Sequence, residues 1–266
     1  MLKIILTGTD GFIGGNIYKE LQTKDSCLVT KLDLEFFQSS DYKFSLEKIF
    51  EEHDYPIHIG ANSDTQESDV NKIMNTNYYI SKQLFELANN YNVKVIYSSS
   101  AAVYGTSGMP ENLYAWTKLI AEDFGIANNK EFVSMRYFNV YGPGEENKGQ
   151  MSSIAYQAWG EKEIKLFPNK PTRDFVYIDD VVEATLFPVF NEYISGIYEV
   201  GTGESRLFED IINLLGINYT YTSEEIIPKG YQFKTRANTK NFYPGWSPKF
   251  SLEKGIEKYL EYLRVL

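Results

Sequence analysis

Tyr114 and Lys118 have the types and spacing that acid–base chemistry requires. They lie four residues apart near the start of a predicted helix from Asn112 to Asn128, so we expect both side chains on one helix face. An ammonium beside a phenol favours the phenolate and lowers the phenol's pKa, which gives a base that works near neutral pH. The chain has 21 tyrosines, and this spacing often arises by chance, so the prediction depends on the accompanying residues.

Three consecutive serines, Ser98, Ser99 and Ser100, lie at the end of a predicted strand that begins at Val93. In open α/β sheets, ligands bind at the carboxyl ends of the strands. The order of these segments along the chain therefore predicts serine hydroxyls close to Tyr114. A hydroxyl in that place can hydrogen-bond a bound ligand.

A glycine-rich turn lies between the first predicted strand, Leu2 to Thr7, and the first predicted helix. Its glycines are Gly8, Gly11 and Gly14. The first permits the tight turn, the second lets the backbone approach a pyrophosphate, and the third lets the helix pack on the sheet. The helix N-terminus adds free N–H groups and a partial positive charge. With a strand before it and a helix after it, this turn predicts a dinucleotide-binding site.

Asp33 follows the second predicted strand, Cys27 to Leu32, about 20 residues beyond the turn. An acidic side chain in this position binds ribose hydroxyls, and the alternative is a solvated acid at the start of a loop. Leu34 and Glu35 come next, no arginine is near to neutralise a 2′-phosphate, and Asp10 adds negative charge. These residues favour NAD over NADP.

Predicted strands and helices alternate along the first half of the chain. The remaining strand-like runs are around Ile57 to Ile59, Val93 to Ser98 and Phe132 to Tyr137, and the long helical runs are Asp69 to Tyr91 and Asn112 to Asn128. Such alternation indicates an α/β fold with a Rossmann-like, doubly wound parallel sheet. The segment from Gln38 to Tyr55 is short for a full crossover and strand.

The pattern becomes less regular after Gly144, where short strands alternate with helices and Pro/Gly turns. We therefore expect a dinucleotide-binding Rossmann domain made of residues 1–143 and part of 174–203. Residues 144–173 and 204–266 are expected to form a smaller C-terminal α/β part that binds the substrate.

The composition limits the possible partners. A formal net charge of −10 argues against nucleic acid or an anionic membrane as partner. The single cysteine, Cys27, fits a reducing compartment and suggests a small core residue. The only two histidines, His53 and His58, are too few for a metal site, and His58 is interpreted as structural. With neither a signal peptide nor an apolar run of membrane-spanning length visible, we expect a cytoplasmic protein without a metal.

Three motifs together resemble the extended short-chain dehydrogenase/reductase family of nucleotide-sugar epimerases and dehydratases. They are Ser98 to Gly105, Arg136 to Pro143 and Arg173 to Val181. The resemblance covers most of the chain and implies a nicotinamide cofactor and a nucleotide-diphosphate sugar. It places Ser100 as the hydroxyl donor beside Tyr114 and Lys118.

Within that family, the segments Asn147 to Ala155 and Lys229 to Gln232 resemble the ADP-glycero-manno-heptose 6-epimerases. This likeness implies NADP as cofactor and a second acid/base at Lys148, opposite Tyr114; a solvated loop lysine is the alternative. It implies substrate contacts at Ser100, Asn139, Gln150, Gln157, Phe167, Arg173 and Tyr231. It implies a cofactor lining made of the glycine turn with Phe12 and Ile13, and of Asp33, Leu34, Ile59, Gly60, Ala61, Asn62, Ser63, Thr76, Asn77, Tyr114, Lys118 and Val140.

The resulting hypothesis is an NAD(P)-dependent epimerase that removes hydride from a sugar carbon, forms a keto intermediate and returns hydride to the opposite face. A 4-epimerase, or a reductase or dehydratase of another nucleotide-sugar, is one alternative. Ala101 and Ala102 lack the acidic pair that a dehydratase of this family carries. A non-catalytic dinucleotide-binding protein is a second alternative. The two long helices could pair across a homo-oligomer, as they do in relatives.

The chain departs from the heptose epimerases at several places near the site. It is shorter after Asp33 and between Gly105 and Tyr114, so the pocket is expected to be more open. Gln150 and Gln157 stand where serine and histidine substrate contacts are expected. These departures weaken the prediction of the sugar more than that of the reaction.

Overall fold

The computed structural model describes residues 1–148, 154–227 and 231–266, and its centre is a parallel sheet of six strands. The spatial order is β10-β5-β4-β3-β1-β2, and every neighbouring pair is parallel. The strands are β1 (Leu2–Thr7), β2 (Cys27–Leu32), β3 (Tyr55–His58), β4 (Val95–Ser100), β5 (Phe132–Tyr137) and β10 (Gly196–Val200). This order confirms the predicted Rossmann-like, doubly wound α/β fold.

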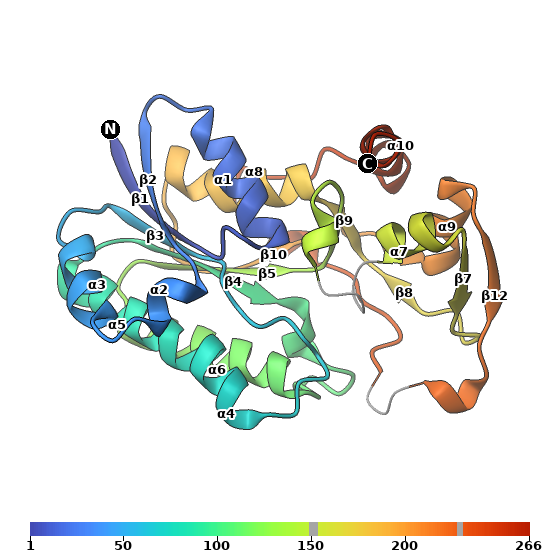
Figure 1. Ribbon diagram of the computed structural model, residues 1–266, viewed down its shortest axis with the longest axis horizontal. Coiled ribbons are helices and arrows are strands. Elements are labelled where there is room, and N and C mark those ends of the chain that lie inside the picture. The colour runs from blue at the N-terminus through green and yellow to red at the C-terminus, as the bar shows by residue number, and fades with distance from the viewer. Residues whose placement is uncertain (149–153, 228–230) are drawn as a thin grey trace.

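Helices cover both faces of this sheet (Figure 1). One face carries α1 (Phe12–Gln22) and α8 (Ile178–Phe190). The opposite face carries α2 (Leu34–Gln38), α3 (Tyr42–Phe50), α4 (Val70–Ile73), the π-helix η1 (Met74–Tyr79), α5 (Ile80–Tyr91) and α6 (Leu113–Asn128). Within the described part of the chain, no helix has the length and apolar character needed to cross a membrane.

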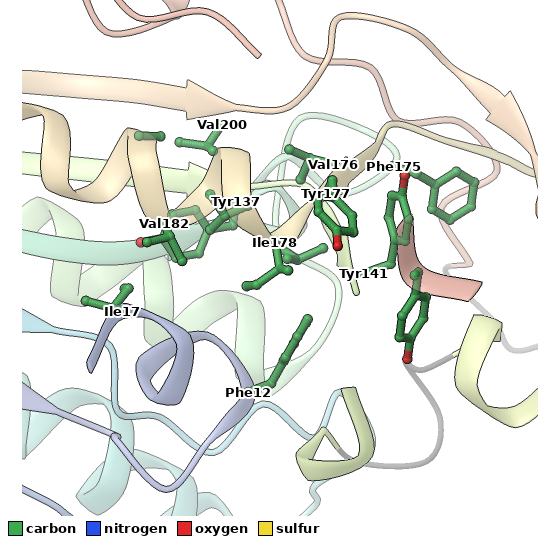
Figure 2. Close-up of a cluster of buried hydrophobic side chains, with 14 of the residues drawn as sticks. Phe12, Ile17, Tyr137, Tyr141, Phe175, Val176, Tyr177, Ile178, Val182 and Val200 are labelled. Carbon is green, nitrogen blue, oxygen red and sulfur yellow. The ribbon is translucent and has the colours of Figure 1, made fainter. Parts of the chain in front are cut away.

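Each sheet face has its own apolar core, which explains why the strands read as nearly continuous apolar runs. On the α5 and α6 side, Phe85, Tyr97 and Phe132 lie together in one buried cluster. On the α1 and α8 side, Ile17 and Val182 begin a cluster that continues beyond the sheet. Figure 2 shows how it passes through Ile178 to the tyrosines of the next layer, Tyr141 and Tyr177.

A smaller part of the chain packs beyond the carboxyl end of the sheet. Among its described residues are three two-stranded ladders: β6 (Asn139–Tyr141) with β9 (Phe175–Tyr177), β7 (Glu163–Leu166) with β12 (Asn218–Tyr221), and β8 (Thr172–Arg173) with β11 (Arg206–Leu207). Its helices are α7 (Ile154–Glu161), α9 (Phe208–Leu215) and α10 (Leu252–Leu263). This part also holds the 3-10 helices η3 (Glu145–Asn147), η5 (Glu224–Ile226) and η6 (Thr239–Asn241), whereas η2 (Ala101–Tyr104) follows β4 of the central sheet.

Several sequence-based predictions differ from this structure; the strand predicted at Val93 to Ser98, for example, is β4 at Val95–Ser100. The run from Asp69 to Tyr91 is helical, but it widens into a π-helix at Met74–Tyr79 instead of continuing as one α-helix. The short segment from Gln38 to Tyr55 accommodates α3, which together with α2 makes the crossover from β2 to β3. Cys27 is half-buried because β2 is the edge strand of the sheet.

Candidate active site

A continuous cavity of about 1120 Å³ runs from the glycine turn to the small C-terminal part. Its walls include almost all of the predicted site residues. They are Gly8, Gly11, Phe12, Ile13, Gly14, Asp33, Leu34, Ile59, Gly60, Ala61, Asn62, Ser63, Thr76, Ser100, Tyr114, Lys118, Asn139, Val140, Lys148, Gln157, Phe167, Arg173 and Tyr231. Asn77 lies outside this lining, and Gln150 lies outside the described residues.

The glycine turn needs its glycines for close backbone packing. Gly8 has φ +73°, and a Cβ there would come within 2.7 Å of the Gly60 backbone. A Cβ on Gly14 would come within 2.0 Å of the Gly8 carbonyl oxygen. Helix α1 starts directly after Gly11, which offers no side-chain cap, so its first N–H groups face the cavity end of the turn. These features form a cradle that fits a pyrophosphate.

Asp33 holds the glycine turn from the end of β2. Its carboxylate accepts hydrogen bonds from the Thr9 backbone N–H at 2.5 Å, from the Thr9 hydroxyl and from the Asp10 backbone N–H at 3.4 Å. The alternative of a merely solvated acid is therefore wrong. The carboxylate lines the cavity while it fixes the turn, and Thr9 is a partner that the sequence pattern did not identify.

Lys118 is anchored to the end of β4. Its ammonium donates to the Ser98 carbonyl oxygen at 2.6 Å and to the Ser98 hydroxyl at 3.3 Å. It also lies 4.8 Å from the centre of the Tyr97 ring. The side chain is only 3% exposed, and burial lowers its pKa to about 7. The N-cap of α6, where the Asn112 side chain accepts from the Ala115 N–H at 2.8 Å, sets where this helix begins.

Tyr114 is half-buried one helical turn before Lys118 and hydrogen-bonds the hydroxyl of Ser100. Burial raises the pKa of the Tyr114 phenol, and the bond from Ser100 opposes that rise. The prediction that Lys118 lowers the Tyr114 pKa is therefore wrong for this arrangement. The physical reason is that the Lys118 ammonium is directed to Ser98. The effect of burial on the phenol's pKa is therefore larger than the effect of the Lys118 charge.

Lys148 lies at the end of η3, where its ammonium donates to the Val140 carbonyl oxygen at 2.9 Å and lies 5.8 Å from the Phe12 ring centre. Burial lowers its pKa, and the nearby Glu145 carboxylate opposes that shift. Glu145 is itself buried, which raises its pKa to about 7. The alternative of a solvated loop lysine is wrong, because these contacts hold Lys148 in the cavity wall.

Arg173 lies in an aromatic part of the cavity and is 7% exposed. Its guanidinium lies 4.9 Å from the Tyr231 ring centre and 5.6 Å from that of Phe208. The Phe167 ring meets Tyr231 edge-on at 5.0 Å. One guanidinium nitrogen, Nη1, donates to the Thr172 carbonyl oxygen at 3.0 Å, and the remaining N–H groups suit an anionic acceptor such as a diphosphate.

Two acids that follow Arg173 in the sequence, Asp174 and Asp179, are engaged with other partners. The Asp174 carboxylate accepts from the backbone N–H groups of Thr202, Gly203 and Ala237. Asp179 pairs with Lys258 at 2.5 Å.

Several residues of the site were missed at the sequence level, and some carried a signal. Ser98 lies two residues before Ser100 on one strand, and strand periodicity places both on the same face as Lys118. Glu145 precedes Lys148 by three residues, but its role beside this proposed base depends on its burial. The sequence does not show that burial. Gln232 donates to the Gly105 carbonyl oxygen at 2.8 Å; it lies in the segment Lys229 to Gln232 that carries the resemblance, but no role was predicted for it.

Known proteins resemble this chain over nearly its full length. It is 31% identical, over an alignment 327 positions long, to the ADP-L-glycero-D-manno-heptose-6-epimerase of Cupriavidus pinatubonensis (strain JMP 134 / LMG 1197), with 98% of each chain covered. The crystal structure of the Helicobacter pylori ADP-L-glycero-D-manno-heptose-6-epimerase matches with a TM-score of 0.84 and 30% identity, covering 100% of this chain and 97% of that one.

A UDP-glucuronic acid 4-epimerase of Bacillus cereus, solved with a substrate analogue and NAD, matches in fold with a TM-score of 0.84 at 21% identity, covering 99% of each chain. A protein-family model described as the NAD dependent epimerase/dehydratase family matches residues 4–201, the segment that holds the glycine turn, Ser100, Tyr114 and Lys118. The cavity and this match agree, and the chain belongs to the NAD dependent epimerase/dehydratase family.

Proposed function

We propose that this enzyme is a nucleotide-sugar epimerase that acts on ADP-glycero-manno-heptose at carbon 6. The observation that carries the proposal is that Lys148 lines the same cavity as the bonded pair Ser100 and Tyr114. Two acid/base groups on opposite sides of the sugar allow one to take the hydroxyl proton and the other to return a proton after the sugar has turned. The names and similarity of the relatives support the choice of sugar.

In the proposed reaction, the glycine cradle would hold a dinucleotide, which when bound would supply the hydride chemistry needed to oxidise the sugar carbon and re-reduce it from the opposite face. Tyr114 or Lys148 takes the hydroxyl proton as the carbonyl forms. Ser100 donates a hydrogen bond to the oxygen of that carbonyl. The sugar then turns in the cavity, and the residue on the other face returns a proton to the oxygen as the C–H bond re-forms.

We assign the cradle of Gly8, Gly11 and Gly14 to the pyrophosphate of the dinucleotide. The lining beside the cradle, including Ile59 to Ser63, would hold the rest of the cofactor. Lys118 would bind the ribose that is attached to the nicotinamide. NAD is the preferred cofactor in this proposal, because the Asp33 carboxylate at the end of β2 would repel a 2′-phosphate. Arg173, Asn139, Gln157, Phe167 and Tyr231 are assigned to the nucleotide-sugar.

The proposal also assigns a role to each part of the chain and an oligomeric state to the enzyme. Residues 1–143 with part of 174–203 would bind the dinucleotide, and residues 144–173 and 204–266 the sugar nucleotide. The enzyme would work in the cytoplasm, where nucleotide-sugars are made, as a homo-oligomer. Exposed apolar side chains on the helices of one sheet face, Val70, Tyr79 and Trp116, support such an assembly. Light scattering coupled to size-exclusion chromatography tests it.

The function is tested with purified enzyme and ADP-D-glycero-D-manno-heptose. We expect the L-glycero epimer by NMR, without net consumption of NAD. Reaction in deuterated water should leave carbon 6 unlabelled, because the hydride returns from the cofactor. UDP-glucose and UDP-glucuronate serve as comparison substrates. Faster epimerisation of either at carbon 4 would contradict the proposed sugar and leave the hydride mechanism in place.

A further inference from the structure

A chain of buried hydrogen bonds connects the turn after β1 with the helix that carries Tyr114, and His58 is at its centre. The His58 ring lies at the end of β3, is 2% exposed and stacks on Tyr97 with ring centroids 5.7 Å apart. Its Nδ1 lies 2.7 Å from the Thr7 hydroxyl oxygen. Its Nε2 lies 2.8 Å from the Ser81 hydroxyl oxygen. The mechanism above does not use this ring.

The contacts of Ser81 fix the proton on one ring nitrogen. The Ser81 hydroxyl also lies 2.5 Å from the backbone carbonyl oxygen of Asn77 in the π-helix η1. A carbonyl oxygen can only accept, so the single hydroxyl hydrogen of Ser81 is donated to Asn77. Ser81 must therefore accept at its other contact, and Nε2 of His58 carries a hydrogen.

The contacts of Thr7 lead independently to the same tautomer. The backbone N–H groups of Ile59 and Gly60 donate to the Thr7 hydroxyl oxygen at 3.1 and 2.9 Å. These bonds occupy both lone pairs, so the Thr7 hydrogen is donated to Nδ1 of His58, which is then unprotonated. The ring is neutral, because burial, helped by the charge of Lys118, lowers the pKa of His58 to about 3.

The same chain continues from η1 to the catalytic helix. The Asn77 amide donates to the Asn62 carbonyl oxygen at 2.9 Å and to the Thr117 hydroxyl at 3.0 Å, and accepts from the Asn62 N–H at 2.7 Å. Thr117 then donates to the Tyr114 carbonyl oxygen at 2.8 Å. Each side-chain donor and acceptor in this chain has a partner, which is what a buried polar network needs to hold one geometry. Single-turn π-helices often occur at functional sites.

We propose that His58 is a positioning residue which, as the neutral Nε2–H tautomer, fixes the glycine turn relative to the helix that carries Tyr114 and Lys118. The other tautomer would direct an N–H at a Thr7 oxygen that already accepts two, and leave Nε2 facing a serine with no hydrogen to give. The consequence for turnover rests on the proposed function, whereas the tautomer follows from the hydrogen bonds alone.

The second histidine of the chain provides an internal control. His53 Nδ1 lies 2.6 Å from the Ile49 carbonyl oxygen, so this nitrogen carries a hydrogen, and its Nε2 lies 2.8 Å from the Thr30 hydroxyl. Two-bond ¹H–¹⁵N correlation spectra of the full chain with NAD bound report the protonation of each ring nitrogen. We expect a protonated Nε2 and a bare Nδ1 for His58 from about pH 5 to about pH 9. A protonated Nδ1 on His58, alone or in an imidazolium, overturns the proposal.

Two variants each remove the hydroxyl partner of one histidine Nε2. Ser81→Ala does so for His58, and Thr30→Val does so for His53. We expect Ser81→Ala to lower kcat about tenfold, equivalent to about 1.4 kcal/mol, with little change in KM for the nucleotide-sugar. Thr30→Val should keep the wild-type kcat. Wild-type kcat in Ser81→Ala, with only a lower unfolding midpoint, would show that the ring is merely structural and overturn the coupling.

A second pair of variants keeps the test decisive if Ser81→Ala does not fold. His58→Gln retains a donor toward Ser81, whereas His58→Leu retains none, so the glutamine variant should have the higher kcat. Equal kcat in both overturns the coupling. If wild-type enzyme turns over no nucleotide-sugar, the proposed function fails. The spectra and a titration with NAD, which Ser81→Ala should bind more weakly than Thr30→Val, then still decide the role of His58.

Discussion

The Lys118 ammonium donates to the Ser98 carbonyl oxygen at 2.6 Å, so the sheet itself holds this buried cation in place. Burial of this ammonium has a measurable cost. Burial lowers the Lys118 pKa from 10.5 to about 7, so between these values the unfolded chain binds a proton that the folded chain does not. Stability from this residue therefore rises with pH across that window and is lowest below about pH 7.

Lys118→Met removes this dependence. We expect the variant to gain unfolding free energy relative to wild type below about pH 7, and to lose that advantage above about pH 10. Urea denaturation across this range measures the difference. Lys162→Met, which changes an exposed lysine, is the control. The same pH dependence in both variants would contradict the assignment.

Tyr114→Phe removes the proposed phenolic acid/base. We expect kcat to fall about 10³-fold while NAD still binds, because the glycine cradle is unchanged. Steady-state kinetics and a titration with NAD measure the two effects. Tyr79→Phe, which changes an exposed tyrosine on η1, should leave both unaffected. Substantial epimerisation by Tyr114→Phe would remove the phenol from the reaction.

Ser100→Ala should change the pH profile as well as the rate. The bond from Ser100 opposes the rise in the Tyr114 pKa that burial causes, so without it that pKa rises further. We expect the part of the kcat/KM profile that depends on the phenolate to move to higher pH. A profile that moves to lower pH would be inconsistent with this hydrogen bond.

Lys148→Met tests the second acid/base. Loss of a positioned proton donor should lower kcat for epimerisation about 10²-fold. Glu145→Gln should alter the pH dependence near neutrality, since burial holds the pKa of that carboxyl at about 7 beside Lys148. Lys162→Met again controls for loss of a surface charge. Unchanged epimerisation by Lys148→Met would leave Tyr114 as the only base.

Arg173→Lys separates bidentate binding from charge. A lysine cannot offer a planar fork or stack between Tyr231 and Phe208, so we expect KM for the nucleotide-sugar to rise at least about tenfold. Arg206→Lys is a matched control. Arg206 lies opposite Arg173 in the register of the β8–β11 ladder, but its guanidinium forms ion pairs with Asp210 and Glu253. Equal effects of the two substitutions would indicate a general loss of stability.

The sequence allowed the fold and most of the cavity to be predicted, because both depend on local patterns. Strands β1, β2 and β5 have the predicted limits, and the glycine spacing identified the cradle. The π-helix was not predictable, because its wider turn depends on long-range bonds from Asn77 to Asn62 and Thr117. Spacing alone also gave the wrong direction for the Tyr114 pKa, since it does not reveal that Lys118 is anchored to Ser98.

Strand β10, residues 196–200, pairs with β5 and completes the sheet that β1 begins. During synthesis, the β5 edge of the sheet stays unpaired until residue 200 has left the ribosome. By then β6 and β9, which pair with each other, have already emerged. An exposed, apolar strand edge carries unpaired backbone N–H and C=O groups that can form hydrogen bonds with strands of other chains. Nascent chains released before β10 should therefore need chaperones, and fragments ending near residue 143 should aggregate when expressed alone.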